Sequence, residues 1–196
     1  MIEALVVSNL VLWVVILALL VAVFALARQI GVLYERVAPM GALVMDNGPK
    51  VGAASPVFAL TSLDGFPVNI GTPSPQSTLL FFLSPTCPVC KKLLPILKSA
   101  AATEKRWLSV VLASDGDEAE QRAFIRRAGL EAFSYVLSTP LGVTYQVSKL
   151  PYAVLLDERG IVRAKGLVNS REQLESLFTA KDLGVASIQD FVDQQA

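Results

Sequence analysis

The sequence predicts an α/β domain, with a mixed central sheet flanked by helices on both faces, preceded by one N-terminal transmembrane helix. Three observations carry this prediction. An uncharged apolar run opens the chain at residues 4–27. Short apolar runs bounded by turn residues then alternate with amphipathic runs, which is the pattern of strands and helices in an α/β sheet. Near the C-terminus, two apolar runs are joined by a polar turn at Asp157–Gly160, which indicates an antiparallel hairpin.

The composition excludes several classes of function. The 196 residues carry 17 Lys and Arg against 17 Asp and Glu, and 53% of them are hydrophobic. A balanced charge without a basic stripe argues against a nucleic-acid-binding surface, because phosphate binding needs an excess of Lys and Arg. The chain contains no His, which removes His-based triads and imidazole metal ligands. Two Cys can build neither a disulfide scaffold nor a four-thiolate zinc site, so we expect no metal and no bound cofactor.

The apolar run at residues 4–27 has the length of a membrane anchor. Only Ser8 and Asn9 are polar within it. At roughly 1.5 Å per residue such a helix reaches about 36 Å, enough to cross a hydrocarbon core of about 30 Å. A cleaved signal peptide is the alternative, since Ala25-Leu26-Ala27 has the small residues of a cleavage site. The length of the run and the absence of Lys or Arg before it favour the anchor.

The chain is therefore divided into an anchor at residues 1–28, a connector at 29–50 and a globular domain at 51–196. The connector holds proline and glycine and lacks a sustained period. Arg28 and Arg36 follow the apolar run at residues 4–27, and no Lys or Arg precedes that run. Taken alone, the positive-inside rule would place the globular domain in the cytoplasm.

Local signals predict the elements of the globular domain. Asp64-Gly65 suits a hairpin turn, because glycine accepts a positive φ. Acids early in the run 115–129 and arginines late in it complement a helix dipole. Ser170 and Gln173 have the spacing of a capping box. The predicted order is a hairpin at 56–70, a buried strand at 78–83, a helix at 91–105, a strand at 107–113, a helix ending at Gly129, a strand at 132–137, a hairpin at 150–166, a helix at 170–180 and a short helix in the tail.

The two cysteines form the motif Cys87-Pro88-Val89-Cys90, between a buried strand and a helix. At a helix N-terminus, free amides and the helix dipole stabilise a thiolate at Cys87. Cys90, one turn further, is shielded and is the natural resolving thiol, able to attack a mixed disulfide at Cys87. An inert disulfide and half of a zinc site shared with a second chain are the alternatives. A disulfide that closes so short a loop stabilises a fold little, which favours redox chemistry.

This motif and its surroundings resemble the thioredoxin superfamily over about residues 51–180. The run 87–98 resembles the family's redox helix, including Pro95, which matches the proline that kinks it. The resemblance implies a thioredoxin-like fold in which Cys87 and Cys90 are catalytic. It also implies that Pro88 and Val89 form the active-site dipeptide.

The resemblance also implies a substrate-positioning loop. Leu150-Pro151 is similar to the family's cis-proline loop, in which the proline faces the cysteine pair and the preceding backbone pairs with the substrate chain. Two positions depart from the family pattern. Phe81 stands where thioredoxin has a buried acid, and Thr86 replaces a frequent aromatic residue. A fast general reductase is therefore not expected, since water or another group would have to accept the proton of Cys90.

A second resemblance covers most of the chain, including the connector. Residues 31–43, 46–60 and 84–95 resemble the MauD family of methylamine dehydrogenase accessory proteins. The family implies a membrane-anchored, periplasm-facing thiol-disulfide oxidoreductase that assists disulfide formation or isomerisation in the small (β) subunit of methylamine dehydrogenase. That subunit is rich in disulfides and carries a tryptophan tryptophylquinone cofactor. The resemblance also implies a partnership with MauE, an integral membrane protein.

These implications decide the expected location. Disulfides persist in the periplasm and are rare in the cytosol. We therefore expect a single-pass protein of the cell membrane with its catalytic domain in the periplasm, against the arginine pattern.

Three other functions compete with this one. A membrane-tethered reductase for cytochrome c maturation would use the same fold, but the connector sequence argues against it. A peroxidase would place its active Cys in a Pro-x-x-x-Thr-x-x-Cys setting, which Pro85-Thr86-Cys87 does not reproduce. A non-catalytic chaperone or docking module for the dehydrogenase subunit would use its cysteines only incidentally. The dipeptide Pro88-Val89 leaves open whether the pair oxidises, isomerises or reduces its client.

Overall fold

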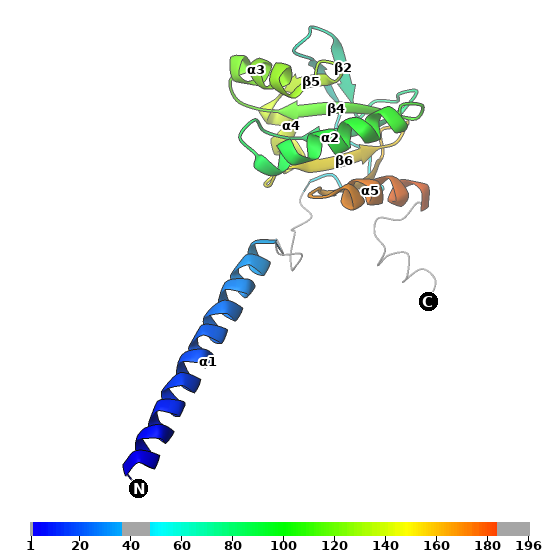
Figure 1. Ribbon diagram of the computed structural model, residues 1–196. Helices are drawn as coiled ribbons and strands as arrows, with labels where there is room; N and C mark the ends of the chain where they lie inside the picture. Colours follow the sequence, from blue (N-terminus) through cyan, green and yellow to red (C-terminus); the bar gives the residue numbers. More distant parts are fainter. Residues whose placement is uncertain (1, 37–47, 184–196) are drawn as a thin grey trace. The chain divides into compact units, whose positions relative to one another are not determined.

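The structure is a computed structural model that describes residues 2–36 and 48–183. The chain divides into two compact units, residues 1–45 and 46–196, and each is described by itself. Figure 1 shows the long helix of the first unit and the layered sheet and helices of the second. The tail helix expected after residue 183 lies outside the described residues.

The first unit contains α1 (Ile2–Arg36). The helix continues through Arg36, so residues 29–36, assigned above to the connector, are helical. Its described side chains are exposed apolar ones for the most part, Trp13 and Phe24 among them. Within the part of the chain that the structure describes, no helix combines the length and the hydropathy needed to cross a membrane.

The second unit is built on a five-stranded mixed sheet, as predicted. The sheet has the order β5-β4-β3-β6-β7, in which β3 pairs parallel with β4, β4 parallel with β5, and β6 antiparallel with both β3 and β7. The strands are β3 (Ser77–Phe82), β4 (Leu108–Ser114), β5 (Ser134–Leu137), β6 (Tyr152–Leu156) and β7 (Val162–Leu167). The central strand β3 is almost wholly buried, which explains why its sequence is a continuous apolar run.

The predicted N-terminal hairpin is present as a separate two-stranded sheet. It consists of β1 (Phe58–Thr61) and β2 (Pro67–Ile70), paired antiparallel. Gly65 lies in the turn with φ 85°, a backbone conformation that residues with a Cβ rarely adopt. Val68 and Ile70 are buried, so the hairpin contributes one of its faces to the core.

Four helices complete the described part of the second unit: α2 (Pro88–Thr103), α3 (Glu118–Ala128), α4 (Thr139–Thr144) and α5 (Arg171–Leu183). Of these, α4 is absent from the sequence-based prediction. Its signal was present, because the Ser138 hydroxyl accepts the Leu141 N–H at 3.2 Å and Pro140 lies in the first turn.

Helix ends follow the predicted signals closely. Asp117 caps α3 by accepting the Glu120 N–H at 2.9 Å, and Gly129 ends it in the left-handed conformation with φ 61°. At α5 the Ser170 hydroxyl accepts the Gln173 N–H at 3.3 Å. The Gln173 side chain accepts the N–H of Asn169 at 2.6 Å, the residue before the one that a capping box would use.

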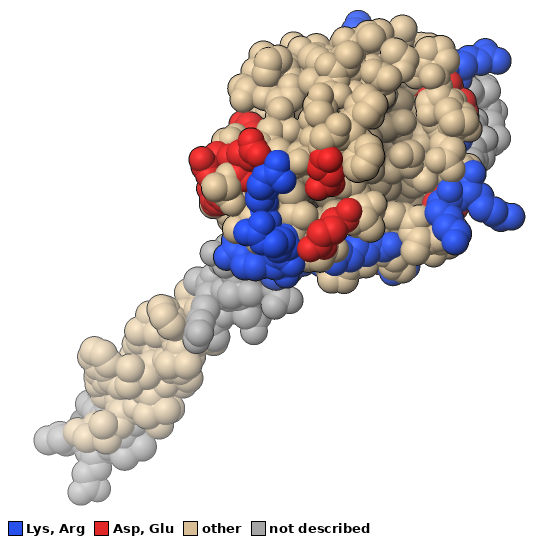
Figure 2. All heavy atoms as spheres, turned by 90° about the horizontal axis from the view of Figure 1, so that it is seen from above, with Lys and Arg blue, Asp and Glu red and all other residues tan. Residues whose placement is uncertain are grey.

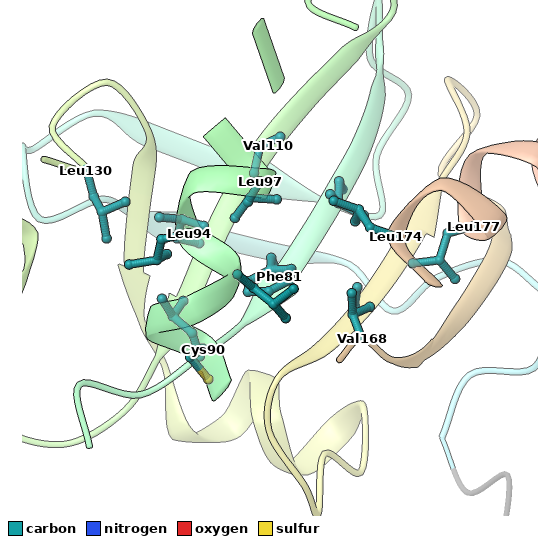
Figure 3. Close-up of a cluster of buried hydrophobic side chains, with 14 of the residues drawn as sticks. Phe81, Cys90, Leu94, Leu97, Val110, Leu130, Val168, Leu174 and Leu177 are labelled. Carbon is teal, nitrogen blue, oxygen red and sulfur yellow. The ribbon is translucent and has the colours of Figure 1, made fainter. Parts of the chain in front are cut away.

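The sheet separates two apolar clusters, because side chains alternate between its faces along each strand. From β3, Leu79 and Phe81 enter the cluster under α2, α3 and α5, drawn in Figure 3. Leu80 and Phe82 enter the other cluster, which includes the hairpin and Leu141 of α4. Helices therefore lie on both faces, but on the second face the β1–β2 hairpin shares the cover with one short helix.

The turn between β6 and β7 is organised by the buried carboxylate of Asp157, which is 5% exposed. Its Oδ1 accepts the N–H groups of Ile161 at 2.8 Å and Arg159 at 2.9 Å, and its Oδ2 accepts the Arg163 guanidinium at 2.7 and 2.8 Å. Burial alone would raise the pKa of Asp157, but the bonds from Ile161, Arg163 and Arg159 outweigh it and lower that pKa below 3.8.

We predict that Asp157→Ala lowers the free energy of unfolding by about 2 to 3 kcal/mol at pH 7, because the partly buried N–H groups of Ile161 and Arg159 and the Arg163 guanidinium lose their carboxylate acceptor. Since folding lowers the pKa of Asp157, its contribution is complete above pH 3.8 and is lost as the pH falls through the folded-state pKa. Urea titration in mild detergent at pH 7 and below pH 3 measures both effects. Asp64→Ala, at an exposed turn, is the control, and an equal loss in both variants would contradict the prediction.

Candidate active site

The cysteine motif lies where the chain leaves the central strand β3 and begins α2. Cys87 is the N-cap of α2, with extended backbone angles of φ −79° and ψ 111°. Cys90, in the first turn, is fully buried, whereas Cys87 is half-buried and Pro88 and Val89 are exposed. The two cysteines form a disulfide, with their Cα atoms 5.3 Å apart. The structure therefore has one sulfur near the surface and its partner behind it.

Local hydrogen bonds shape the turn that carries Cys87. The Ser84 carbonyl accepts the Cys87 N–H at 3.1 Å, and the Ser84 hydroxyl accepts the Thr86 N–H at 3.3 Å. The hydroxyls of Ser84 and Thr86 are 2.9 Å apart and share a further hydrogen bond. Pro88 then begins the helix, at a position where its missing N–H would have had no helical partner. This short polar turn explains why a helix starts directly after an apolar strand.

The N-terminus of α2 supplies the electrostatics of the site. Cys87 Sγ accepts the Cys90 N–H at 3.1 Å, so the sulfur occupies the position of a capping oxygen. When the disulfide is reduced, the same amide and the helix dipole favour a negative charge on Cys87. The first turn of α2 contains no acid, and exposed Lys91 and Lys92 follow Cys90. Every fixed charge in this turn is therefore of the sign that stabilises a thiolate.

The surroundings of Cys90 are apolar. Its sulfur lies in the buried cluster that also contains Phe81, Leu93 and Leu94 (Figure 3). Phe81 is itself fully buried. The buried residues that share this cluster with Cys90 are apolar ones, Phe81 of β3 among them.

The second predicted segment, Leu150-Pro151, reaches the same edge of the sheet. The bond between these residues is a cis peptide, as the resemblance implied. Pro151 is buried and precedes Tyr152, which pairs in the sheet with Phe82, the last residue of β3. Because β3 and β6 are antiparallel, the end of β3 and the start of β6 lie together. The cysteine loop and the cis-proline loop therefore leave the sheet at one edge.

Charged residues are sparse in the segments around this edge. Residues 65–90 and 132–148 contain no Lys, Arg, Asp or Glu, but the exposed Lys91, Lys92 and Lys149 follow these two segments directly. Figure 2 shows one face on which charged side chains gather toward the border and leave a wide uncharged area. The loops at this edge therefore combine uncharged segments with three basic side chains at their borders.

The disulfide also bears on the zinc alternative. Both sulfurs are bonded to each other, so this state offers no thiolate to a metal. Within residues 2–36 and 48–183, no group of three or more acidic or sulfur ligands is placed to hold an ion.

Sequence reasoning did not find every residue at this edge. The turn residues Ser84 and Thr86 had a signal, since Ser and Thr commonly bond to nearby backbone groups. The rings of Phe82 and Tyr145 lie 5.8 Å apart across the second face of the sheet. No spacing in the sequence relates them.

Comparison with known proteins defines the class. Residues 75–162 match a family model described as thioredoxin-like. A putative thiol:disulfide interchange protein DsbE from Chlorobium tepidum has a TM-score of 0.62 at 21% identity, covering 68% of this chain and 99% of that one. StoA from Bacillus subtilis has a TM-score of 0.55 at 26% identity, and the match covers 66% of this chain and 99% of StoA. The fold and the cysteine pair are those of a thioredoxin-like thiol-disulfide oxidoreductase.

Relatives of nearly the same length define the family. The chain is 49% identical to the methylamine utilization protein MauD of Methylobacillus flagellatus, covering 94% of this chain and 90% of the relative. It is 48% identical to the protein of the same name from Methylorubrum extorquens, and the match covers 97% of this chain and 93% of the relative. The chain belongs to the MauD family of methylamine utilization proteins.

We predict that in the reduced protein Cys87 reacts with iodoacetamide at least about tenfold faster than Cys90 at pH 7, because only Cys87 combines access with the helix N-terminus. Mass spectrometry of timed samples measures the modification of each residue. In urea the two rates should become similar. Equal rates in the folded protein would contradict the assignment of Cys87 as the nucleophile.

Proposed function

We propose that this protein is a membrane-anchored thiol-disulfide oxidoreductase that assists disulfide formation or isomerisation in the small (β) subunit of methylamine dehydrogenase. One observation carries the chemistry: the Cys87–Cys90 disulfide caps α2, with one sulfur half-buried and the other fully buried. Membership of the MauD family supports the connection with methylamine utilisation.

The exchange has two balanced steps. A client thiolate attacks Cys87 Sγ, the bond to Cys90 breaks, and Cys90 leaves as a thiolate that takes up a proton. A second client thiolate then attacks the client sulfur of the mixed disulfide and releases Cys87. The client loses two electrons and two protons to the cysteine pair. With the pair initially reduced, the same steps open a wrong client disulfide and allow it to re-form elsewhere.

The remaining site residues have roles in holding the client. Pro88 and Val89 are exposed beside Cys87, and they form a small uncharged surface where the client sulfur arrives. The backbone at Leu150 and Pro151 lies at the same edge of the sheet, which supports its role in pairing with the client chain. Leu150 is 37% exposed and offers an apolar contact next to that backbone.

The location follows from the apolar sequence and from the chemistry. The proposed single membrane anchor rests on the uncharged run at residues 4–27 of the sequence, and not on the described part of the structure, in which no helix meets the criterion for a membrane span. A pair that forms or rearranges disulfides works where disulfides persist, which supports a periplasmic domain. In this arrangement the client is the dehydrogenase small subunit, and a MauE-like integral membrane protein is the partner in the bilayer.

We predict that Cys90→Ser accumulates a mixed disulfide with the dehydrogenase small subunit, because no resolving thiol remains to release Cys87. Non-reducing electrophoresis and mass spectrometry of membranes from cells grown with methylamine detect it. Cys87→Ser is the matched variant, and it should form no such adduct and should fail to restore dehydrogenase activity in a deletion strain. Full activity with Cys87→Ser would leave only a docking role.

We predict that alkaline phosphatase fused after Ala196 is active, because this enzyme needs the disulfides that form outside the cytoplasm. A green fluorescent protein fused at the same point and exported unfolded should stay dark. The opposite pair of results would place the domain in the cytoplasm, in line with Arg28 and Arg36.

A further inference from the structure

One aromatic ring lies at the junction of the two active-site loops. Phe82 is the last residue of β3, five positions before Cys87. Its ring centroid is 5.8 Å from that of Tyr145 and 6.4 Å from that of Tyr152, both in tilted geometry. Ring pairs at these separations attract each other beyond their burial.

Tyr145 and Tyr152 lie at the two ends of residues 146–151, the segment that contains Leu150 and Pro151. This whole segment is called the cis-proline loop below. At one end, Tyr145 closes α4 by donating its N–H to Leu141 at 3.0 Å. At the other end, Tyr152 begins β6 opposite Phe82. Both ends of the loop therefore pack on the ring that also marks the start of the cysteine loop.

Besides its contact with the Phe82 ring, Tyr145 is held by a hydrogen bond at its hydroxyl. Its hydroxyl is hydrogen-bonded to that of Ser55, and both residues are buried, 2% and 5% exposed. Burial raises the pKa of Tyr145, and the Ser55 bond only partly opposes this, so the phenol remains neutral and keeps its proton for the bond.

Ser55 belongs to a segment that is itself held firmly. Its N–H donates to Gly160 at 2.9 Å, and the Gly52 N–H donates to Val162 at 2.8 Å, so this segment lies along the edge of β7. At Gly48, with φ 108°, a Cβ would come within 2.6 Å of the Tyr145 carbonyl oxygen. The segment before β1 thus contacts Tyr145, the residue before the cis-proline loop, at Ser55 and at Gly48.

We propose that Phe82, Tyr145 and Ser55 are positioning residues for the exchange reaction, holding the cis-proline loop at a defined distance from Cys87. This inference rests on the function proposed above. A polypeptide client must meet Cys87 with its sulfur and the cis-proline loop with its backbone. A small dithiol needs only the sulfur. A displaced loop therefore slows exchange with polypeptides and spares exchange with small thiols.

The test uses the full-length oxidised protein in detergent micelles and two reductants. One is an unstructured synthetic peptide with two cysteines, and the other is dithiothreitol. Quenched-flow mass spectrometry gives the rate constant for each. We expect Tyr145→Phe and Ser55→Ala each to slow the peptide by about three- to tenfold, the size of one lost buried hydrogen bond, and to change the dithiothreitol rate by less than about twofold.

Further variants separate positioning from general stability. Ser55→Ala also removes the bond that the Ser55 hydroxyl donates to the Pro56 carbonyl at 3.0 Å. The double variant of Ser55 and Tyr145 should therefore show the loss of Ser55→Ala and not the product of the two losses, because the bond between the two hydroxyls is already absent in either single variant. Tyr135→Phe is the matched control, since Tyr135 is 1% exposed, donates to Gln121 at 2.6 Å and lies in the other apolar cluster. Its peptide rate should stay unchanged. Phe82→Leu, which removes both ring contacts, should slow the peptide more than Tyr145→Phe does.

Four results would overturn the inference. Equal slowing of peptide and dithiothreitol, or equal slowing in Tyr135→Phe, would show a general loss of stability. Unchanged peptide rates in Tyr145→Phe and Ser55→Ala would show that the loop is held by other contacts. A wild-type disulfide that does not exchange with the peptide at all would instead refute the proposed function, and this inference with it.

Discussion

Cys87 accepts the Cys90 N–H at the first turn of α2, and this contact depends on where the central strand ends. β3 lies between β4 and β6 and is covered on both faces, so its direction is set by the whole sheet. A helix that begins directly after such a strand has its N-terminus at the sheet edge, where its free amides face solvent. The sulfur of Cys87 lies at this N-terminus, where it is accessible to reagents and is close to the positive end of the helix dipole. Cys90, three residues later, is buried in the core.

Because side chains alternate along β3, neighbouring residues of this strand pack in different apolar clusters on the two faces of the sheet. Phe81 belongs to the cluster that shields Cys90, whereas Phe82 belongs to the cluster that meets the cis-proline loop. A shift of one residue in the register of this strand would exchange these environments. The two parts of the proposed site, Cys90 and the loop before β6, thus lie against consecutive residues of one strand.

Much of this arrangement could be predicted from local signals. The strand before Cys87, the helix after it and the hairpin around Asp157 each follow from hydrophobic pattern and turn residues. The cis bond before Pro151 followed only from resemblance, because a proline in sequence carries little information about its isomer. The helix α4 was missed, since six residues are too few for a period to show. The extension of α1 to Arg36 was missed because proline and glycine further along residues 29–50, and the lack of a sustained period there, suggest a connector.

By itself, the sequence determined the chemistry: two cysteines three positions apart at the start of a helix, no histidine to assist them, and an apolar N-terminal run. These are properties of neighbouring residues, and neighbours are set by the covalent chain. Only the tertiary structure decided which residues stand beside the site. The hydroxyls of Ser55 and Tyr145 meet across 90 positions, and Pro151 reaches the edge where β3 ends through the pairing of Phe82 with Tyr152. Such contacts arise from strand order and register, which depend on the packing of the whole sheet and leave no local pattern to read.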